Sequence, residues 1–276
     1  MSIRRNHHVW LALTVIVIGI TAYGFSSRRL SQTPQNRVGA KALRNDQFVR
    51  MSSLEPRLRP ALQALGDRIQ KPGKERMILM GTMQIANGET TPIALNLQFP
   101  DRLRLEEQGI GPRRLLTFDS STPGRAGNSL DQTDRDIIET LVYDTAEHFF
   151  LTQANGSATR LLGLRFRADD GTAPNYSGPY YDLYEVSDLV STKSEPQVQS
   201  KYYSINSTTL LPERVQYQVQ RNGSPVQVEI RLSEWQETVG QILARRIVRL
   251  ENNQPAITLT ITSVAFAGKA DDGMYR

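Results

Sequence analysis

The chain has 276 residues, of which 39% are hydrophobic and 22% charged, which is enough apolar surface for one good-sized core and too balanced a composition for a wholly disordered chain. Its formal net charge of +5 is spread along the sequence, which excludes the clustered basic face of a nucleic-acid-binding protein. Cysteine is absent, which excludes disulfides, thiolate metal sites, cysteine nucleophiles and the lipidated cysteine of a bacterial lipoprotein.

The first 25 residues predict passage across a membrane. Arg4 and Arg5 precede an uncharged, mostly apolar run of about 17 residues from Val9 to Phe25, a length between a signal-peptide core and a minimal membrane span. Two alternatives stay open: cleavage after Gly24, or retention of residues 9–25 as an inner-membrane tether. Both predict that the remainder is periplasmic or exported.

A linker is predicted over residues 26–56, which are rich in Ser, Gln, Asn, Arg and Pro and show no apolar periodicity. A helix is predicted over Pro60–Ile69, because its apolar residues recur at helical spacing and proline suits a first helical turn. We expect one folded domain over residues 57–268, followed by a C-terminal tail at residues 269–276.

Short alternating segments separated by turn residues predict an antiparallel sheet in which each strand pairs with the next. The expected strands are 77–83, 93–99, 102–106, 114–118, 163–167, 180–186, 201–205, 215–220, 226–235, 242–250 and 257–266. A Gly- and Pro-containing loop at 123–127 and a long helix over Asp134–Phe150 interrupt the series. Asp134 and Asp136 lie near the start of this helix, where carboxylates are favoured.

Catalytic chemistry has little support in the sequence. The sequence shows neither a nucleophile elbow nor a glycine-rich phosphate loop between a strand and a helix, and we expect no catalytic residue, metal site or cofactor. His148 is the only histidine beyond the first eight residues, and its predicted role is that of a surface or partly buried residue, with a catalytic or pH-sensing role as the alternative. Trp235 is expected in the core, and Arg245, Arg246 and Arg249 at solvated positions on a strand.

A run of turns and strands in the second half of the chain resembles a known family. It comprises Leu210–Arg214 before a strand, the hairpin Val215–Ile230, Ser233–Glu237, and Val239–Ala244 after a glycine turn. Phe99–Arg104 resembles the same family's strand-proline-strand corner. In this order they are similar to the bacterial outer-membrane lipoprotein carrier and receptor superfamily, the LolA-like and LolB-like folds, and the resemblance covers residues 57–266 in outline.

The resemblance implies a mainly β (α+β) fold, in which a curved antiparallel sheet forms an incomplete β-barrel with covering helices. It also implies an apolar concavity that accepts acyl chains, with the helix around Ile138–Phe149 as a candidate lid. The candidate ligand-binding residues are Leu95, Leu97, Ile138, Leu141, Val142 and Phe149. The long tether and the missing lipid-attachment cysteine match neither a free carrier nor an anchored receptor, which puts the cargo in doubt.

The leading functional hypothesis is a non-enzymatic envelope protein that binds a lipid, an acyl chain or a lipoprotein. The alternative is an envelope protein-protein interaction module whose interior is filled by its own side chains. A hydrolase that uses a pair of carboxylates is a more distant third, and a cleft that holds two carboxylates within reach of one another would favour it.

Overall fold

The computed structural model describes residues 56–109, 114–120, 130–154, 158–167, 178–191 and 196–275. The predicted membrane segment, the linker up to residue 55 and the loop at 123–127 lie outside these residues. The chain divides into two compact units, Met1–Gly39 and Ala40–Arg276, and every described element belongs to the second. Within the described part of the chain, no helix combines the length and the apolar character that a membrane crossing requires.

Short helices open the described part of the chain. A 3-10 turn (η2, Pro56–Leu58) leads into α1 (Arg59–Leu65), with a proline in the first turn, and α2 (Asp67–Gln70) follows. Gly66 separates the two helices with a φ of 76°, a conformation that favours glycine. The predicted helix over 60–69 is therefore confirmed with a break at Gly66, and its apolar residues Ala61, Leu62 and Leu65 are buried.

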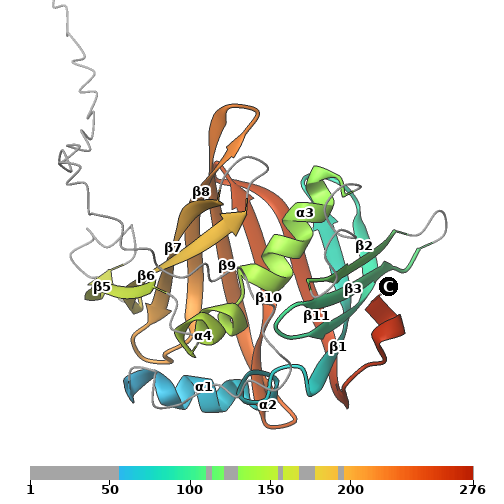
Figure 1. Cartoon of the computed structure of the whole chain (residues 1–276), viewed down its shortest axis with the longest axis horizontal. Helices are drawn as coiled ribbons and strands as arrows, with labels where there is room; N and C mark the ends of the chain where they lie inside the picture. Colours follow the sequence, from blue (N-terminus) through green and yellow to red (C-terminus); the bar gives the residue numbers. More distant parts are fainter. Residues whose placement is uncertain are drawn as a thin grey trace, which may run out of the picture. The chain divides into compact units, whose positions relative to one another are not determined.

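A single antiparallel sheet contains eleven strands. They are β1 (Glu75–Ile85), β2 (Thr90–Gln98), β3 (Arg102–Glu107), β4 (Leu115–Asp119), β5 (Ala158–Arg167), β6 (Tyr180–Ser191), β7 (Pro196–Asn206), β8 (Pro212–Arg221), β9 (Ser224–Thr238), β10 (Gln241–Glu251) and β11 (Gln254–Gly268). Their order is β4-β3-β2-β1-β11-β10-β9-β8-β7-β6-β5. Each strand therefore pairs with the next one in the chain, except that β4 does not pair with β5, and β1 also pairs with β11. Strands β4 and β5 form the two edges. The predicted mainly β fold, with a curved sheet that forms an incomplete barrel, is confirmed (Figure 1).

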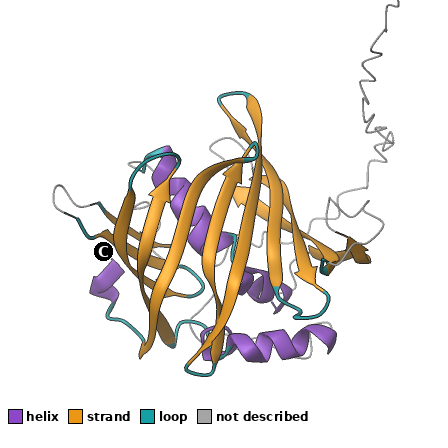
Figure 2. Ribbon diagram, turned by 180° about the vertical axis from the view of Figure 1, so that it is seen from behind, coloured by secondary structure: helices purple, strands orange, loops and turns teal. Residues whose placement is uncertain are grey.

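The inner face of the sheet is apolar because alternate residues of each strand point toward it. On β2, for example, Ile93, Leu95 and Leu97 are buried in turn, as are Val228, Ile230 and Leu232 on β9. Figure 2 shows the convex side of the sheet toward the viewer, with the helical segment between β4 and β5 behind the sheet. The core therefore lies in the hollow of the curved sheet.

Residues 132–154 cross this hollow, and we call them the helical cover. The cover comprises α3 (Gln132–Ile138), a π-helical turn (η3, Glu139–Tyr143) and α4 (Ala146–Ala154) (Figure 1). The prediction of one continuous helix over Asp134–Phe150 is wrong, because Asp144 leaves the helical conformation and Thr145 begins a new helix. The Thr145 hydroxyl accepts a hydrogen bond from the His148 backbone N–H at 3.1 Å, as an N-cap does.

The chain end described by the structure packs against the sheet. The 3-10 turn η4 (Asp272–Tyr275), within the predicted tail at 269–276, contacts β3 and β4. Tyr275 is buried there, and the Arg104 side chain donates a hydrogen bond to the Met274 carbonyl at 3.0 Å.

Candidate functional site

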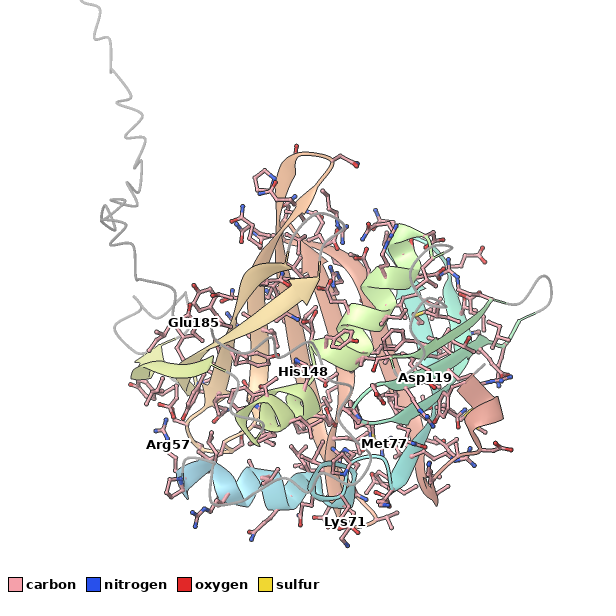
Figure 3. All side chains as sticks on the ribbon, in the orientation of Figure 1. Arg57, Lys71, Met77, Asp119, His148 and Glu185 are labelled. Atoms are coloured by element: carbon pink, nitrogen blue, oxygen red, sulfur yellow. The ribbon has the colours of Figure 1, made fainter. Side chains whose placement is uncertain are left out.

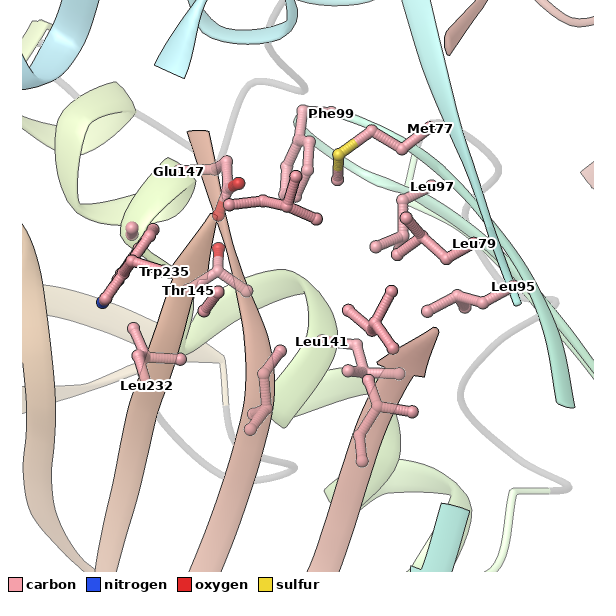
Figure 4. A pocket seen from close by; sticks show the side chains of 16 residues that line it. Met77, Leu79, Leu95, Leu97, Phe99, Leu141, Thr145, Glu147, Leu232 and Trp235 are labelled. Carbon is pink, nitrogen blue, oxygen red and sulfur yellow. The ribbon is translucent and has the colours of Figure 1, made fainter. Parts of the chain in front are cut away.

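A small apolar cavity lies between the sheet and the helical cover (Figure 4). Side chains from β1, β2, β9, β10 and β11 form one side of the cavity, and residues 141–147 of the helical cover form the other. Of its 16 lining residues, all but Thr145 and Glu147 are apolar. Its volume is ≈ 30 Å³, whereas pockets for small molecules measure about 300–1,000 Å³. The concavity is thus nearly filled in this conformation.

The structure brings three of the six predicted ligand-binding residues together at this cavity. Leu95 and Leu97 line it from β2 and Leu141 from the helical cover. Ile138 and Val142 are buried on the same cover without lining the cavity. The sixth, Phe149, packs in an aromatic cluster with Phe150, Tyr184 and Tyr203, whose ring centroids lie 5.2, 5.6 and 4.9 Å from that of Phe149.

Trp235 reaches the cavity through a break in the alternation of β9. Since Val228, Ile230 and Leu232 face inward, strict alternation would place Glu234 inside and Trp235 outside. Instead Glu234 is exposed and Trp235, which is partly buried, lines the cavity. Glu234 has a φ of 56°, a left-handed conformation that is uncommon for residues other than glycine. This one distorted residue therefore turns the indole inward.

A buried charged cluster holds the middle of the helical cover to the sheet. At its centre is Arg249 of β10, whose side chain has no exposed surface. The Arg249 guanidinium lies 3.3 Å from the Asp136 carboxylate, 3.2 Å from that of Glu139 and 2.8 Å from that of Glu251. Because Asp136 and Glu139 belong to the cover and Glu251 to β10, Arg249 joins the two layers.

The same charged cluster extends around Asp144, at the end of the π-helical turn. Its carboxylate accepts hydrogen bonds from the Lys201 ammonium at 2.8 Å and from the Tyr217 hydroxyl at 2.6 Å. Arg221 contributes a further cation, which binds Glu251 at 2.7 Å and also contacts Asp136. Strands β7, β8 and β10 thus all contribute side chains that bind the helical cover.

Burial sets the protonation of this charged cluster. Removal from water raises the pKa of Asp136 above its ordinary value, although Arg249, Gln132 and Arg221 partly oppose this rise. Burial also raises the pKa of Glu139, and the neighbouring Asp144 carboxylate raises it further. The pKa of the Tyr217 phenol lies well above its ordinary value, chiefly through burial. Asp136, Glu139 and Tyr217 each have a partner in Arg249, and none of the three lines the apolar cavity.

The expectation that Arg249 is solvated is wrong, and so is the reading of Asp136 as only a helix-start charge. Asp131 caps α3 instead, because its side chain accepts a hydrogen bond from the Asp134 N–H at 2.7 Å. Arg246 is exposed, as expected. Side chains of a strand alternate between its two faces, so Arg249 lies on the face opposite the exposed Arg246. This alternation was the sequence signal that Arg249 could face the core.

A second buried cation, Arg68, holds the start of α4. Its side chain, with 0% exposed surface, lies 3.0 Å from the Glu147 carboxylate and 2.9 Å from the Gln241 side-chain oxygen. It also donates hydrogen bonds to the Leu65 and Ile242 carbonyls. Since Glu147 lines the cavity, this ion pair closes the cavity on the side of α2. Neither residue was predicted to take part in the site.

The remaining candidate residue from the sequence is His148. His148 lies on α4, partly buried, with its ring edge-on to Tyr143 at 5.6 Å between centroids (Figure 3). Over the described ranges, no group of three or more His, Asp or Glu side chains is placed to hold a metal ion. What the site offers is an apolar cavity under a helical cover that charged side chains hold at two points.

Comparison with known proteins gives matches of fold. No family model and no curated protein matches the chain. Among solved structures, it is similar to a Vibrio parahaemolyticus domain whose description relates it to outer membrane lipoprotein sorting, with a TM-score of 0.47, 11% identity, and coverage of 79% of this chain and 95% of that one. It is also similar to a LolA superfamily protein from Nitrosomonas europaea, with a TM-score of 0.45, 10% identity, and coverage of 79% and 97%.

A third similar structure is a DUF1329 family protein from Desulfovibrio piger, with a TM-score of 0.42, 10% identity, and coverage of 83% of this chain and 98% of that one.

Proposed function

We propose that this domain is a non-enzymatic envelope protein that binds the acyl chain of a lipid or of a lipidated protein between its sheet and its helical cover. The observation that carries the proposal is the cavity itself, a space of ≈ 30 Å³ with an apolar lining, left open inside a curved sheet. A well-packed core has few voids larger than a water molecule, and a void lined by apolar side chains stays dry and accepts apolar ligands.

The small volume means that an acyl chain enters only if the helical cover moves away from the sheet. Burial contributes about 0.8 kcal/mol per methylene, so about 15 methylenes gain roughly 12 kcal/mol. Association costs about 4 kcal/mol or more, which leaves about micromolar affinity before any cost of moving the cover. The acyl chain must therefore replace most of the apolar contacts that the cover gives up.

The place of action in this proposal follows from the N-terminal segment. The apolar run at residues 9–25 sends the domain into the periplasm or out of the cell, and it tethers the domain to the inner membrane if it is not cleaved. Fractionation of cells that produce the chain, followed by mass determination of its N-terminus, distinguishes a cleaved soluble protein from a tethered one. Recovery in the cytoplasm would contradict this part of the proposal.

Titration of a fluorescently labelled long-chain fatty acid tests the binding directly. A chain that begins at Ala40 is suitable, because it keeps the compact unit to which all described elements belong. Ala244, on the cavity wall, offers a blocking variant, Ala244→Leu, because the added carbons fill the cavity. Ala265→Leu is the matched control, since Ala265 is exposed on β11.

We expect saturable binding by the unmodified chain and by Ala265→Leu, and weakened binding by Ala244→Leu. If the unmodified chain shows no saturable binding while its circular dichroism is that of a folded β protein, the proposal is wrong.

The small cavity volume also favours a second function, an envelope protein-protein interaction module with a filled interior. In that case the helical cover is a permanent part of the core, and the outer face or an edge of the sheet binds the partner. Hydrogen exchange discriminates the two functions without a ligand. A cover that opens exchanges its backbone amides over residues 132–154 well before those of β9–β11, whereas a permanent cover exchanges them together with the sheet.

A further inference from the structure

Three buried donor nitrogens lie on one pair of strands without an acceptor among the residues that the structure describes. They are Nε and Nη1 of Arg245 and Nε1 of Trp235, each removed from solvent and without a hydrogen-bond partner. Nη2 of Arg245 donates to the Thr238 hydroxyl at 2.7 Å, a neutral partner. Buried donors normally find acceptors, and a buried guanidinium normally has an anion beside it. The buried arginines Arg68, Arg102 and Arg249, by contrast, each have a carboxylate partner.

The register of β9 and β10 places these donors beside the apolar cavity. Trp235 pairs with Ala244, and both residues line the cavity. Arg245 follows Ala244 directly, opposite Glu234, the residue whose left-handed backbone turns the Trp235 indole inward. Backbone strain of this kind is concentrated at functional sites. Strands β9 and β10 thus form one wall of the cavity. They carry the strained Glu234, the Trp235 indole and the Arg245 guanidinium.

The surrounding carboxylates leave the charge of Arg245 unneutralised. Glu147, on the cavity wall, is bound to Arg68, whereas Glu234 and Glu237 are exposed on β9. Among the residues that the structure describes, none forms an ion pair with Arg245. Arg245, the neighbour of the cavity-lining Ala244, therefore has no anionic partner there, and its Nε and Nη1 and the Trp235 Nε1 are free to donate.

We propose that Arg245 and Trp235 bind the anionic head group, a carboxylate or a phosphate, of the acyl ligand whose chain occupies the adjoining cavity. The inference rests on the proposed function and specifies its ligand class as a singly acylated anion. The guanidinium supplies the positive charge and donates hydrogen bonds to either anion from Nε and Nη1, and the indole N–H adds a further donor. The helical cover supplies apolar contacts to the chain, and β9 and β10 supply the polar ones to the head.

Binding of matched single-chain ligands tests this assignment. Palmitate, its methyl ester and hexadecyl phosphate share the same chain length, and only the ester is uncharged. Trp235 is the only tryptophan beyond residue 39, so its fluorescence in the chain that begins at Ala40 reports binding without a label. Arg245→Gln removes the cation, and Arg246→Gln is its control, because Arg246 is the exposed neighbour on the same strand.

We expect the unmodified chain to bind at least one of the two anions about tenfold or more tightly than the ester, as charge-assisted hydrogen bonds provide. The tighter of the two identifies carboxylate or phosphate as the head group. Arg245→Gln should abolish the preference over the ester and Arg246→Gln should keep it. Trp235→Phe, with binding followed by calorimetry, should reduce the preference for the anion over the ester, because the indole N–H donor is lost.

Equal affinity for anions and ester in the unmodified chain would overturn the head-group assignment and leave acyl binding intact. Retention of the preference by Arg245→Gln would overturn it as well. If none of the three ligands binds, the proposed function itself is wrong, and the assignment falls with it. Should Arg245→Gln fail to fold by circular dichroism, Arg245→Lys keeps the charge but lacks the planar fork, and it should lose most of the preference.

Discussion

Replacing Arg249 by methionine tests whether the charged cluster holds the helical cover. Methionine keeps much of the apolar volume but removes the cation that contacts Asp136, Glu139 and Glu251. Asp136 and Glu251 would retain Arg221 as a partner, so Glu139 is the carboxylate that loses its ion pair. Loss of one partner of a buried ion pair costs about 3–5 kcal/mol. Arg249 also lies 3.7 Å from the Asp144 carboxylate, which would keep Lys201 as its partner. Because three of the four carboxylates keep a cation, we expect a loss of about 3 kcal/mol in the free energy of unfolding.

The loss should also depend on pH. Burial already raises the pKa of Glu139, and without Arg249 that pKa rises further. A carboxyl group whose pKa is higher in the folded state stabilises that state below its unfolded pKa, and it loses this contribution as the pH rises through the folded pKa. The destabilisation by Arg249→Met should therefore be larger at pH 7 than at pH 5.

Urea unfolding at both pH values, followed by circular dichroism, measures this. Arg246→Met is the control, because Arg246 is exposed on the same strand, and such a change usually alters stability by less than about 0.5 kcal/mol. A loss below about 1 kcal/mol at pH 7, against the 3–5 kcal/mol typical of a broken buried pair, would refute the reasoning. So would an equal loss at both pH values, because the protonation of Glu139 would then play no part.

Three further predictions address other parts of the fold. Gly81→Ala should destabilise the domain by about 1–3 kcal/mol in urea unfolding, because the new Cβ would clash with the Thr260 carbonyl oxygen. Gly268→Ala meets nothing within 4 Å and should be neutral, and equal effects of the two changes would contradict the close approach of β1 and β11. Val239→Asn should raise the free energy of unfolding by about 1 kcal/mol, and with it the melting temperature, because Val239 has a φ of 51° that asparagine tolerates better. An unchanged or lower melting temperature would be evidence against strain at this turn. Burial raises the pKa of Asp101, so the ionised form of Asp101 lowers the stability of the domain at neutral pH, and this effect disappears as the pH falls. In urea unfolding, Asp101→Asn should therefore be more stable relative to the unmodified chain at pH 7 than at pH 4. The opposite trend would show that Asp101 is held in its ionised form.

Local patterns were sufficient for most of the elements. Alternation along β2 and β9 and helical spacing over residues 60–69 are properties of neighbouring residues, so each was visible without the fold. The left-handed turn at Asn222-Gly223 could be read directly, since these residues favour a positive φ. The break at Thr145 was missed because the apolar periodicity of the cover continues through it, although an Asp-Thr pair before Glu147 is an N-cap signal.

The site was predictable only in its apolar part. The position of Leu95, Leu97 and Leu141 at the cavity could be expected from the sequence, because a residue on the apolar face of a strand or helix must face whatever space the core contains. Their role in ligand binding stays a prediction. The charged cluster escaped because an arginine on a strand is usually solvated, and Arg249 is buried only where Asp136 and Glu139, more than 100 positions away, meet it. Trp235 was assigned to the core, but nothing local predicted the distorted backbone at Glu234.

The sequence by itself determined that this chain forms an antiparallel, two-faced sheet with an apolar helical segment inserted between its halves, because side-chain periodicity and turn chemistry act over a few residues. Only the tertiary structure decided that β1 pairs with β11, how nearly the hollow is filled, and which charges meet inside it. All three features depend on contacts between residues far apart in the chain. In such contacts a shift of about an ångström decides whether a cavity is left in the core and whether a buried arginine reaches a carboxylate.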